Sequence, residues 1–536
     1  MGPQTIQLQH GIIGPTSPPT RKIGEFIRGS GGPGISGPAD FARPGTRSAA
    51  RRTRPRFTTA LFSAPPTATL VRPAANWIST RNDSSVVPIG RSRARRDGRG
   101  RISGIRRLPK NQLIHSSMPT QPHPNSGNSG YVAMTLKRTL FAFVTALSVC
   151  AADSPKAVSP EASVRLKAIT ARFEHMVEQG QISGAVLLVA HHNQVVLLDA
   201  VGFQNIEKKT PMRTDSIFQI LSQTKSFTSV GVMLLVDEGR VLLTDPVEKY
   251  LPEFRGLQVA DGGKLRKPKR PMAVWDLLAH TSGMAHDGAP ELSNLLVTMD
   301  RSLAEAVTIQ AKLPLTRDPG SEWAYCNENT AAAGRIIEVV SGRPYDQFIK
   351  ARILDPLGMK DSFYFPDAAS KPRIAMLYHS VKGKLERSGP EVTGGDPARY
   401  REGAIYPGPE FGLYSTASDM AAFHLMMLNG GTWQGQRIVS RSAVDVMTAV
   451  HTSDLPTKYP GSGWGLGWHI IRSPAGMLTM LSLGAYGHGG GFGTYSFVDR
   501  SKDLVGVMMI QSSGTPVDVR CVFTTMVNAA IDRETQ

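Results

Sequence analysis

Apolar runs typical of β-strands occur in two regions of this sequence, at 185–198 and at 465–510. A long stretch with a mainly helical pattern separates them. Residues 185–189 and 195–198 flank the polar segment 191–194, which predicts a β-hairpin. Further strands are predicted at 465–470, 494–498 and 504–510. The chain is therefore predicted to carry strands near its two ends and a helical, loop-rich region at about 255–455 between them.

Helical periodicity is clearest near the first strands, where Val164, Leu166, Ile169, Phe173 and Met176 precede the helix-stopping Gly180. Further helices are predicted at 227–236, 329–340, 345–354, 418–428 and 517–531, with a short one closed by a turn at 275–283. We interpret His280, within that short segment, as a structural residue. No second hydrophobic span and no internal repeat accompanies these elements.

Positive charge is concentrated in the first quarter of the 536-residue chain, whose formal net charge is +18. Residues 1–133 contain 20 lysines and arginines against 4 acidic residues and show no sustained apolar period, so disorder is expected there. A basic arm that binds nucleic acid or an anionic membrane is the alternative. The basic loop 264–270 is interpreted as solvated surface, and no nucleic-acid partner is predicted.

Residues 134–152 have the pattern of a secretory signal peptide. Lys137 and Arg138 precede the apolar run 140–149, and small residues follow at 150–152. The run is too short to span a bilayer. We expect that translation starts at Met134, that 1–133 reflects an upstream start assignment, and that the protein is exported to the periplasm or secreted. A lipid anchor at Cys150 is the alternative.

Metal and disulfide sites are not predicted. His191 and His192 lie at the hairpin tip, but no further ligand has a suitable spacing, so we interpret both as solvated turn residues. The three cysteines are too few for a disulfide framework. No cofactor is predicted either.

Ser222 and Lys225 form the only Ser-x-x-Lys of the chain, directly before the helical run 227–236, which ends near Gly239. At this spacing on a helix, both side chains lie on one face with about 5–6 Å between their Cβ atoms. Lysine in a site that lowers its pKa is a base that activates a serine hydroxyl. Ser222 would lie at the helix N-terminus, which favours developing negative charge. A chain of this length holds roughly one such pattern by chance, so downstream motifs must support it.

Two downstream motifs supply that support. Tyr325-Cys326-Asn327 is the only Tyr-x-Asn. A tyrosine near Lys225 becomes a better base, because the positive charge lowers its pKa, and the Asn327 amide can both donate to a substrate carbonyl and accept from Lys225. The Gly-rich run 487–491 precedes a predicted strand. Glycines at a strand edge allow close substrate approach and leave N–H groups free, so a second oxyanion donor is expected there.

Ser-x-x-Lys, Tyr-x-Asn and His-x-Gly in this order resemble the serine β-lactamase and penicillin-binding protein superfamily. The match is closest to its class C-like branch of D-aminopeptidases, carboxypeptidases and esterases. It covers about 160–530, with supporting stretches at 277–284, 355–359, 412–420 and 465–468. The resemblance implies an α+β fold, in which an antiparallel sheet is flanked by helices and a mainly helical lobe is inserted. Within a hydrolase domain at 153–536, the α/β lobe would comprise about 160–254 and 456–536, and the helical lobe about 255–455.

The resemblance also implies roles for the motif residues. Ser222 would attack the acyl carbon, with Lys225 and Tyr325 as joint general base, and water would later hydrolyse the acyl-enzyme. The N–H groups of Ser222 and Gly491 would form the oxyanion hole. Substrate contacts would come from Asn327, His488, Gly489 and Gly490. The implied substrate is a small molecule or a peptidoglycan-type compound: a short acyl ester, a D-amino peptide or a β-lactam.

Two departures from the family pattern matter. His488 stands where true class C β-lactamases have lysine. With an ordinary pKa of about 6.5 it would be mostly neutral near pH 7, which favours uncharged esters over anionic β-lactams, although a protonated His488 could receive a carboxylate at lower pH. Cys326 is interpreted as a packing residue.

Two other functions were considered. An α/β-hydrolase would require Gly-x-Ser-x-Gly, which the chain lacks. A penicillin-binding or peptidoglycan-binding relative with little turnover is the remaining alternative.

Overall fold

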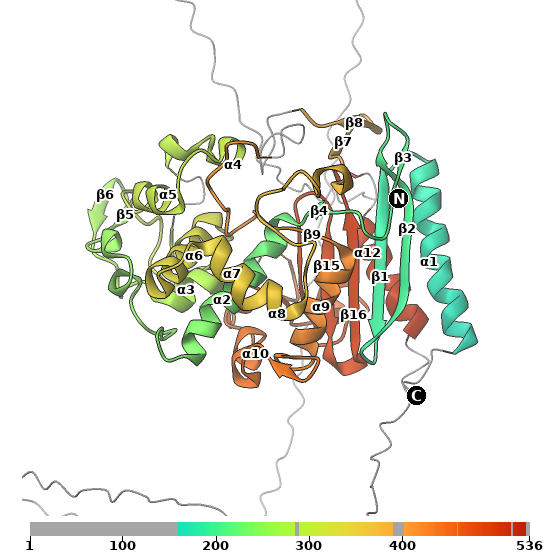
Figure 1. Ribbon diagram of the computed structural model, residues 1–536. Coiled ribbons are helices and arrows are strands. Elements are labelled where there is room, and N and C mark those ends of the chain that lie inside the picture. The colour runs from blue at the N-terminus through green and yellow to red at the C-terminus, as the bar shows by residue number, and fades with distance from the viewer. Residues whose placement is uncertain (1–158, 285–288, 390–400, 458, 516–517, 532–536) are drawn as a thin grey trace, which may run out of the picture. The chain divides into compact units, whose positions relative to one another are not determined.

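The computed structural model describes residues 159–284, 289–389, 401–457, 459–515 and 518–531 (Figure 1). The basic segment 1–133 and the signal-peptide pattern at 134–152 lie outside the described residues, and both remain predictions from the sequence. Among the residues that are described, no helix is both long and apolar enough to cross a membrane.

An eight-stranded antiparallel sheet joins the two ends of the described chain, in the order β12-β13-β14-β15-β16-β1-β2-β3. β1 pairs with β2 through the predicted hairpin, and its other edge pairs with β16, where Ala185 lies opposite Ile510. The predicted antiparallel sheet is thus confirmed. The strands are β1 (Gly184–His191), β2 (Gln194–Asn205), β3 (Thr210–Pro211), β12 (Ser462–Trp464), β13 (His469–Ile471), β14 (Tyr486–Gly489), β15 (Tyr495–Asp499) and β16 (Leu504–Ile510).

Both faces of this sheet are covered by helices, which explains why β1 is apolar at nearly every position. Successive side chains of a strand point to opposite faces. Leu187 of β1 packs with α1 (Pro160–Glu178) and α12 (Val519–Ile531), whereas Leu188 packs into the core that contains α2 (Thr224–Asp237) and α9 (Ala417–Leu428). Figure 1 shows α1 beside β1 and β2. The helices predicted at 164–176, 227–236, 418–428 and 517–531 are therefore confirmed.

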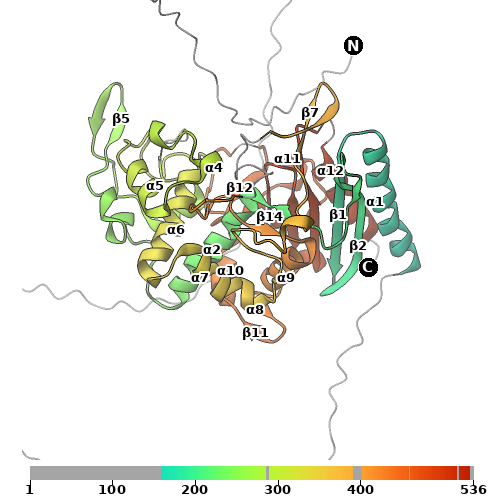
Figure 2. The same ribbon diagram turned by 45° about the horizontal axis from the view of Figure 1, so that its top comes forward.

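A helical region fills much of the chain between the two groups of strands, and its core is α6 packed on α2, α3 and α5. In Figures 1 and 2 these helices lie on the side of α2 away from α1. The helix predicted at 345–354 begins as α7 and continues as a π-helical turn, Lys350–Leu354. α9, by contrast, packs on β1, β15 and β16 and belongs to the sheet's covering layer. The remaining helices are α3 (Val274–Ala279), α4 (Leu295–Thr298), α5 (Leu303–Gln310), α6 (Asn327–Ser341), α7 (Tyr345–Ile349), α8 (Asp355–Leu357), α10 (Arg441–Met447) and α11 (Pro474–Met477).

Short strands form small sheets around these layers. They are β4 (Phe218–Gln219) with β9 (Tyr414–Ser415), β5 (Val259–Asp261) with β6 (Lys264–Arg266), β10 (Thr432–Trp433) with β11 (Gln436–Arg437), and β7 (Tyr378–Val381) between β8 (Lys384–Arg387) and β17 (Ser512–Ser513). The pair β4–β9 matters for function, because β4 leads directly to Ser222.

The strand predicted at 465–470 is wrong for 465–468, and only His469 and Ile470 lie in a strand. β12 ends at Trp464 and β13 begins at His469, and the residues between them form a tight turn in which the Gly465 amide donates to the Trp468 carbonyl. Gly467 adopts φ +77°, a conformation that glycine reaches without steric penalty. The apolar residues of this run resemble a strand, but Gly465 and Gly467 form part of the turn.

The interpretation of the His pair needs a partial correction. His192 lies in the β1–β2 turn as expected, with φ 49° and an exposed side chain that contacts Asp503 at 3.3 Å. His191 instead is the last residue of β1 and is buried. Among the described residues, no group of three or more His, Cys, Asp or Glu could hold a metal ion.

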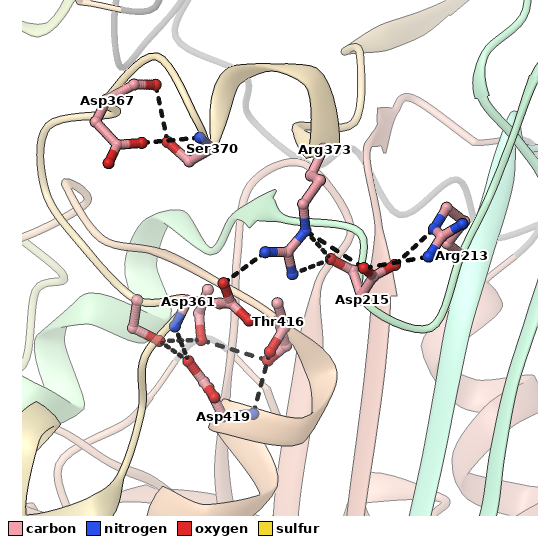
Figure 3. A network of polar contacts seen from close by, with 10 residues as sticks. Arg213, Asp215, Asp361, Asp367, Ser370, Arg373, Thr416 and Asp419 are labelled. Atoms are coloured by element: carbon pink, nitrogen blue, oxygen red, sulfur yellow. Dashed lines mark hydrogen bonds and ion pairs between the residues drawn. The ribbon is translucent and has the colours of Figure 1, made fainter.

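A polar network fixes the chain just before β4 (Figure 3). The Arg373 guanidinium donates to the Asp361 carboxylate at 2.6 Å and, through Nε, to the Asp215 carbonyl at 3.0 Å. Asp419 on α9 accepts from the Asp361 amide at 2.9 Å. Three separate segments are thereby tied together, and the strand that leads to Ser222 has a fixed start.

Candidate active site

Ser222 lies in a single 3₁₀ turn, Leu221–Gln223, directly before α2. Leu221 adopts φ 45°, in the left-handed region that costs a non-glycine residue about 1–2 kcal/mol. Two contacts hold this turn: Thr224 Oγ1 donates to the Leu221 carbonyl at 2.6 Å, and Thr494 Oγ1 donates to the Ile220 carbonyl at 3.2 Å. The half-buried Ser222 is therefore presented at the N-terminal end of α2, as the sequence predicts.

Lys225 is buried, and its ammonium group has three acceptors. Nζ donates to Asn327 Oδ1 at 2.8 Å, to the Glu410 carbonyl at 2.9 Å and to Ser222 Oγ at 3.3 Å. An ammonium has three N–H donors, so each proton has one partner. A neutral amine would keep two of these donor contacts and direct its lone pair at the third partner. The long contact to Ser222 Oγ is the one best suited to become that acceptor contact.

Tyr325 lies beside this pair, just before α6. Lys225 Nζ lies 4.9 Å from the centre of the Tyr325 ring. The ring also lies against His280, tilted by 35° at 4.6 Å between centroids, and meets Trp464 edge to face at 5.7 Å. The Cys326 amide, next along the chain, donates to His280 Nδ1 at 3.2 Å. His280 thus supports the Tyr325 segment, in agreement with its interpretation as a structural residue.

Cys326 itself belongs to the hydrophobic core. Its side chain is 1% exposed and its thiol donates to Glu328 at 3.0 Å. Burial, with the negative charge of Glu328, raises the pKa of the thiol well above its ordinary value. A thiol that resists ionisation is a poor nucleophile, which agrees with a packing role.

The glycine-rich motif brings the sheet edge against the Ser222 turn. His488 and Gly489 end β14, and Gly490 and Gly491 begin the turn to β15. A Cβ atom on Gly490 would lie 2.4 Å from the Ile220 carbonyl oxygen, and one on Gly491 would lie 3.1 Å from Leu221 Cδ1. Only glycine permits the first approach. The structure therefore places Gly491 next to the residue that precedes Ser222.

His488 lies in a buried environment that disfavours the charged form of its imidazole. Its side chain is 5% exposed, Nδ1 contacts the Gly489 carbonyl at 2.8 Å, and the buried Nε2 has no hydrogen-bond partner within the described part. Burial, with the nearby charge of Lys225, lowers the pKa of His488 to about 3. This environment disfavours the protonated His488 that we considered from the sequence as a carboxylate partner at lower pH.

Glu410 is a site residue that no sequence motif indicated. It is 2% exposed, its main-chain carbonyl holds Lys225, and its Oε1 accepts from the Tyr406 hydroxyl at 2.9 Å. Oε2 has no hydrogen-bond partner among the residues described. Burial raises the pKa of Glu410 to about 7. The negative charge of Glu328 acts in the same direction, whereas the positive charge of Lys225 acts against it. The sequence offered one indication of a buried acid, because Glu410 stands between the apolar residues Pro409 and Phe411.

Comparison with known proteins shows the family to which the chain is similar. The family model described as Beta-lactamase matches residues 169–529. Esterase EstB of Burkholderia gladioli is 29% identical over 374 residues, which cover 65% of this chain and 91% of EstB. Penicillin-binding protein 4 of Amycolatopsis lactamdurans is 30% identical over 327 residues, covering 60% of this chain and 78% of that protein.

A solved structure shows the same fold. EstCE1, a hydrolase with promiscuous acyltransferase activity, superposes with a TM-score of 0.60 at 22% identity, covering 69% of this chain and 98% of that one. The sheet formed from both chain ends and the helical region between them are thus shared with a known hydrolase fold.

Proposed function

Because the chain belongs to the beta-lactamase family, we propose that it is a serine hydrolase that acts through an acyl-enzyme at Ser222. The observation that carries the proposal is the position of Lys225. Its Nζ lies 3.3 Å from Ser222 Oγ, and Asn327 and the Glu410 carbonyl occupy its two other contacts. Such a lysine is oriented to exchange one proton with one hydroxyl.

The proposed reaction begins when the proton of Ser222 passes to Lys225 and Tyr325, which act as one base. Ser222 Oγ forms a bond to the acyl carbon, and the bond to the leaving group then breaks while Tyr325 returns the proton to the departing oxygen or nitrogen. Water attacks the acyl-enzyme in the second half and restores the hydroxyl. The Tyr325 ring beside Lys225 Nζ, at 4.9 Å, supports this pairing.

We assign stabilisation of the oxyanion to the N–H groups of Ser222 and Gly491. Gly491 belongs to the glycine-rich turn, which packs against Leu221, the residue before Ser222. The N-terminal end of α2 adds a favourable dipole for the developing charge. Asn327 would orient the substrate carbonyl, and Gly489 and Gly490 would line the edge along which the substrate lies.

For the substrate class we favour uncharged short acyl esters over anionic β-lactams, within a class C-like branch of the family. His488 has no charge to hold a carboxylate, since its pKa is lowered to about 3. A charge-assisted hydrogen bond contributes roughly 1.5–3 kcal/mol, against about 1 kcal/mol for a neutral one. The relative EstB is an esterase. A penicillin-binding or peptidoglycan-binding protein with little turnover is the second candidate, favoured by the likeness to penicillin-binding protein 4.

The nucleophile is tested by covalent labelling. Ser222→Ala should lose ester turnover and all labelling by a fluorophosphonate probe, while its circular dichroism and thermal unfolding stay unchanged. Lys225→Ala and Tyr325→Phe should each lower kcat by orders of magnitude without additive effects, because they act as one unit. Ser501→Ala, at an exposed position between β15 and β16, serves as the control and should still be labelled. Labelled Ser222→Ala protein would refute the mechanism.

The substrate class is tested by kcat/KM at pH 5, 6, 7 and 8 for p-nitrophenyl butyrate, nitrocefin, benzylpenicillin and a D-Ala-D-Ala peptide. We expect the butyrate ester to be the best substrate at every pH. Because His488 stays neutral over this range, the preference should not shift toward the anionic substrates at pH 5. Benzylpenicillin as the best of the four would contradict the assignment.

Export to the periplasm or secretion is also part of the proposal, with lipidation at Cys150 as an alternative. It rests on the residue pattern at 134–152 alone. N-terminal sequencing of protein from its native cells tests it: a mature end close to Ala151 or Ala152 supports export, whereas peptides from 1–133 would revive the basic arm.

A further inference from the structure

Arg520 lies at the beginning of α12, outside every sequence motif, and it reaches the glycine-rich turn. Its Nη2 donates to the Gly490 carbonyl at 2.5 Å. The guanidinium also lies directly against Gly489, because a Cβ atom built there would be 2.8 Å from Nη1 and 2.9 Å from Cζ. The C-terminal helix thus places a cation behind the turn that carries Gly491.

The contact with Gly490 determines which way the Gly491 amide points. The Gly490 carbonyl and the Gly491 N–H belong to one planar trans peptide unit and point in opposite directions. The Gly490 carbonyl accepts from Arg520 and, at 3.1 Å, from the Gly493 amide. The Gly491 N–H must therefore point away from Arg520. Gly491 itself lies against the segment that precedes Ser222, because a Cβ atom built on it would be 3.1 Å from Leu221 Cδ1.

The charge of Arg520 strengthens this effect. Within the described residues it makes no ion pair with a carboxylate at 4.0 Å or less, and Tyr495 and Asp518 are the nearby groups that favour its charge. Burial lowers the pKa of the guanidinium, but an arginine stays charged in a protein. A cation bonded to a carbonyl polarises its peptide unit, which makes the N–H on the other end a stronger donor.

We propose that Arg520 is a positioning residue that aims and polarises the Gly491 amide of the oxyanion hole. This inference rests on the proposed function of Ser222. Arg520 acts through the peptide between Gly490 and Gly491, so it affects the transition state of every substrate, charged or uncharged. The rival role, an anchor for a substrate carboxylate, would affect only anionic substrates.

The test uses Arg520→Met, which keeps the aliphatic stem, and Arg520→Lys, which keeps a charge. The matched control is Arg500→Met, which removes another partly buried guanidinium that packs on the β14 residue Tyr486 and pairs with Asp445. Measured quantities are kcat and KM for p-nitrophenyl butyrate, the affinity for a boronic acid that mimics the tetrahedral intermediate, and the unfolding temperature.

We expect Arg520→Met to lower kcat about 10- to 100-fold, below the loss of roughly 10²–10³ that follows complete removal of an oxyanion donor. KM should change less than about threefold, since a ground-state carbonyl carries little charge. Boronic acid affinity should fall by the same factor as kcat/KM. Arg520→Lys should recover most of kcat, and Arg500→Met should keep the wild-type kcat.

Several results would overturn the inference. An unchanged kcat in Arg520→Met, a rise in KM alone, or a loss confined to nitrocefin and benzylpenicillin would each do so, and the last would identify a carboxylate anchor. If Arg520→Met does not fold, Arg520→Gln, which removes the charge but keeps N–H donors, carries the test: a lowered boronic acid affinity with an unchanged KM supports the proposal, and an unchanged boronic acid affinity overturns it. Turnover by Ser222→Ala would refute the proposed function as well, whereas inactive Ser222→Ala beside a fully active Arg520→Met refutes only the role of Arg520.

Discussion

Glu410 shows how one buried residue can link the candidate site to the stability of the whole protein. Its pKa is raised to about 7, mainly by burial, while Lys225, Tyr406 and Glu328 are the polar groups around it. In an unfolded chain a glutamate titrates near 4.3. The folded protein therefore prefers the protonated form. This contribution to stability is fully present below pH 4.3 and is lost as the pH rises through about 7.

Glu410→Gln should remove this pH dependence, because the amide never ionises and still offers an oxygen to the Tyr406 hydroxyl. We expect the free energy of unfolding of the wild type to fall more steeply than that of the variant between pH 5 and 8, with the variant the more stable at pH 8. Urea unfolding at four pH values measures both. Glu291→Gln, at an exposed position, is the control and should follow the wild type. Parallel curves for wild type and Glu410→Gln would contradict the prediction.

The site residues differ in how far the sequence alone predicts them. Ser222 and Lys225 are close in the chain, so helical geometry is enough to bring them together. Asn327 and Gly491 were placed by the order of motifs and the family resemblance. Glu410 was missed, and the buried environment of His488 was not foreseen. Both depend on burial that arises only when distant segments pack, and no local pattern records it.

At the scale of elements, the turn between β12 and β13 is a direct support of the catalytic helix. The Gly467 amide donates to the Leu278 carbonyl at 2.9 Å, and its carbonyl accepts from Ser226 on α2 at 3.0 Å. Ser229, one helical turn further on, donates to the Leu466 carbonyl at 2.5 Å. This docking also explains why an apolar run that resembles a strand forms a turn.

Gly467→Ala should destabilise the protein more than a turn glycine in open space does. A Cβ atom at Gly467 would lie 2.7 Å from Ser229 Cβ and 3.2 Å from the Lys225 carbonyl. We expect a loss of about 1–3 kcal/mol from overpacking beyond the strain of the positive φ, together with a lower kcat because α2 is displaced. Gly262→Ala is the control, since Gly262 has φ +57° and no atom near its Cβ position. Equal losses of unfolding free energy would exclude the clash.

At the scale of the whole molecule, the outer helices α1 and α12 bring the two ends of the described chain together over one face of the sheet. Phe173 of α1 and Phe523 of α12 are both fully buried, and their rings meet edge to face at 6.3 Å between centroids. This contact joins α1 to α12. Because Arg520 of α12 also bonds to Gly490, the packing of the two outer helices is connected to the glycine-rich turn.

A double-mutant cycle measures the interaction energy between Phe173 and Phe523. Phe173→Leu and Phe523→Leu should each lower the free energy of unfolding by about 1–2 kcal/mol. Their combination should be less destabilising than the sum by about 0.5–1.5 kcal/mol, the energy of an aromatic pair. Phe173→Leu combined with Phe348→Leu, in the separate core around α2, should be additive within about 0.5 kcal/mol. Additivity in the first pair would show that the two ends do not cooperate.

The pairing of β1 with β16 also means that β1 is synthesised long before one of its two neighbouring strands. β1 ends at His191 and its partner begins at Leu504, roughly 300 residues later, an interval of about 15–60 s at ordinary elongation rates. During that time β1, which is buried at every position in the finished protein, has β2 on one side only. An unpaired apolar edge is a template for aggregation. The last tenth of the chain therefore covers the exposed edge of β1, and we expect the growing polypeptide to be prone to aggregation until β16 has been synthesised.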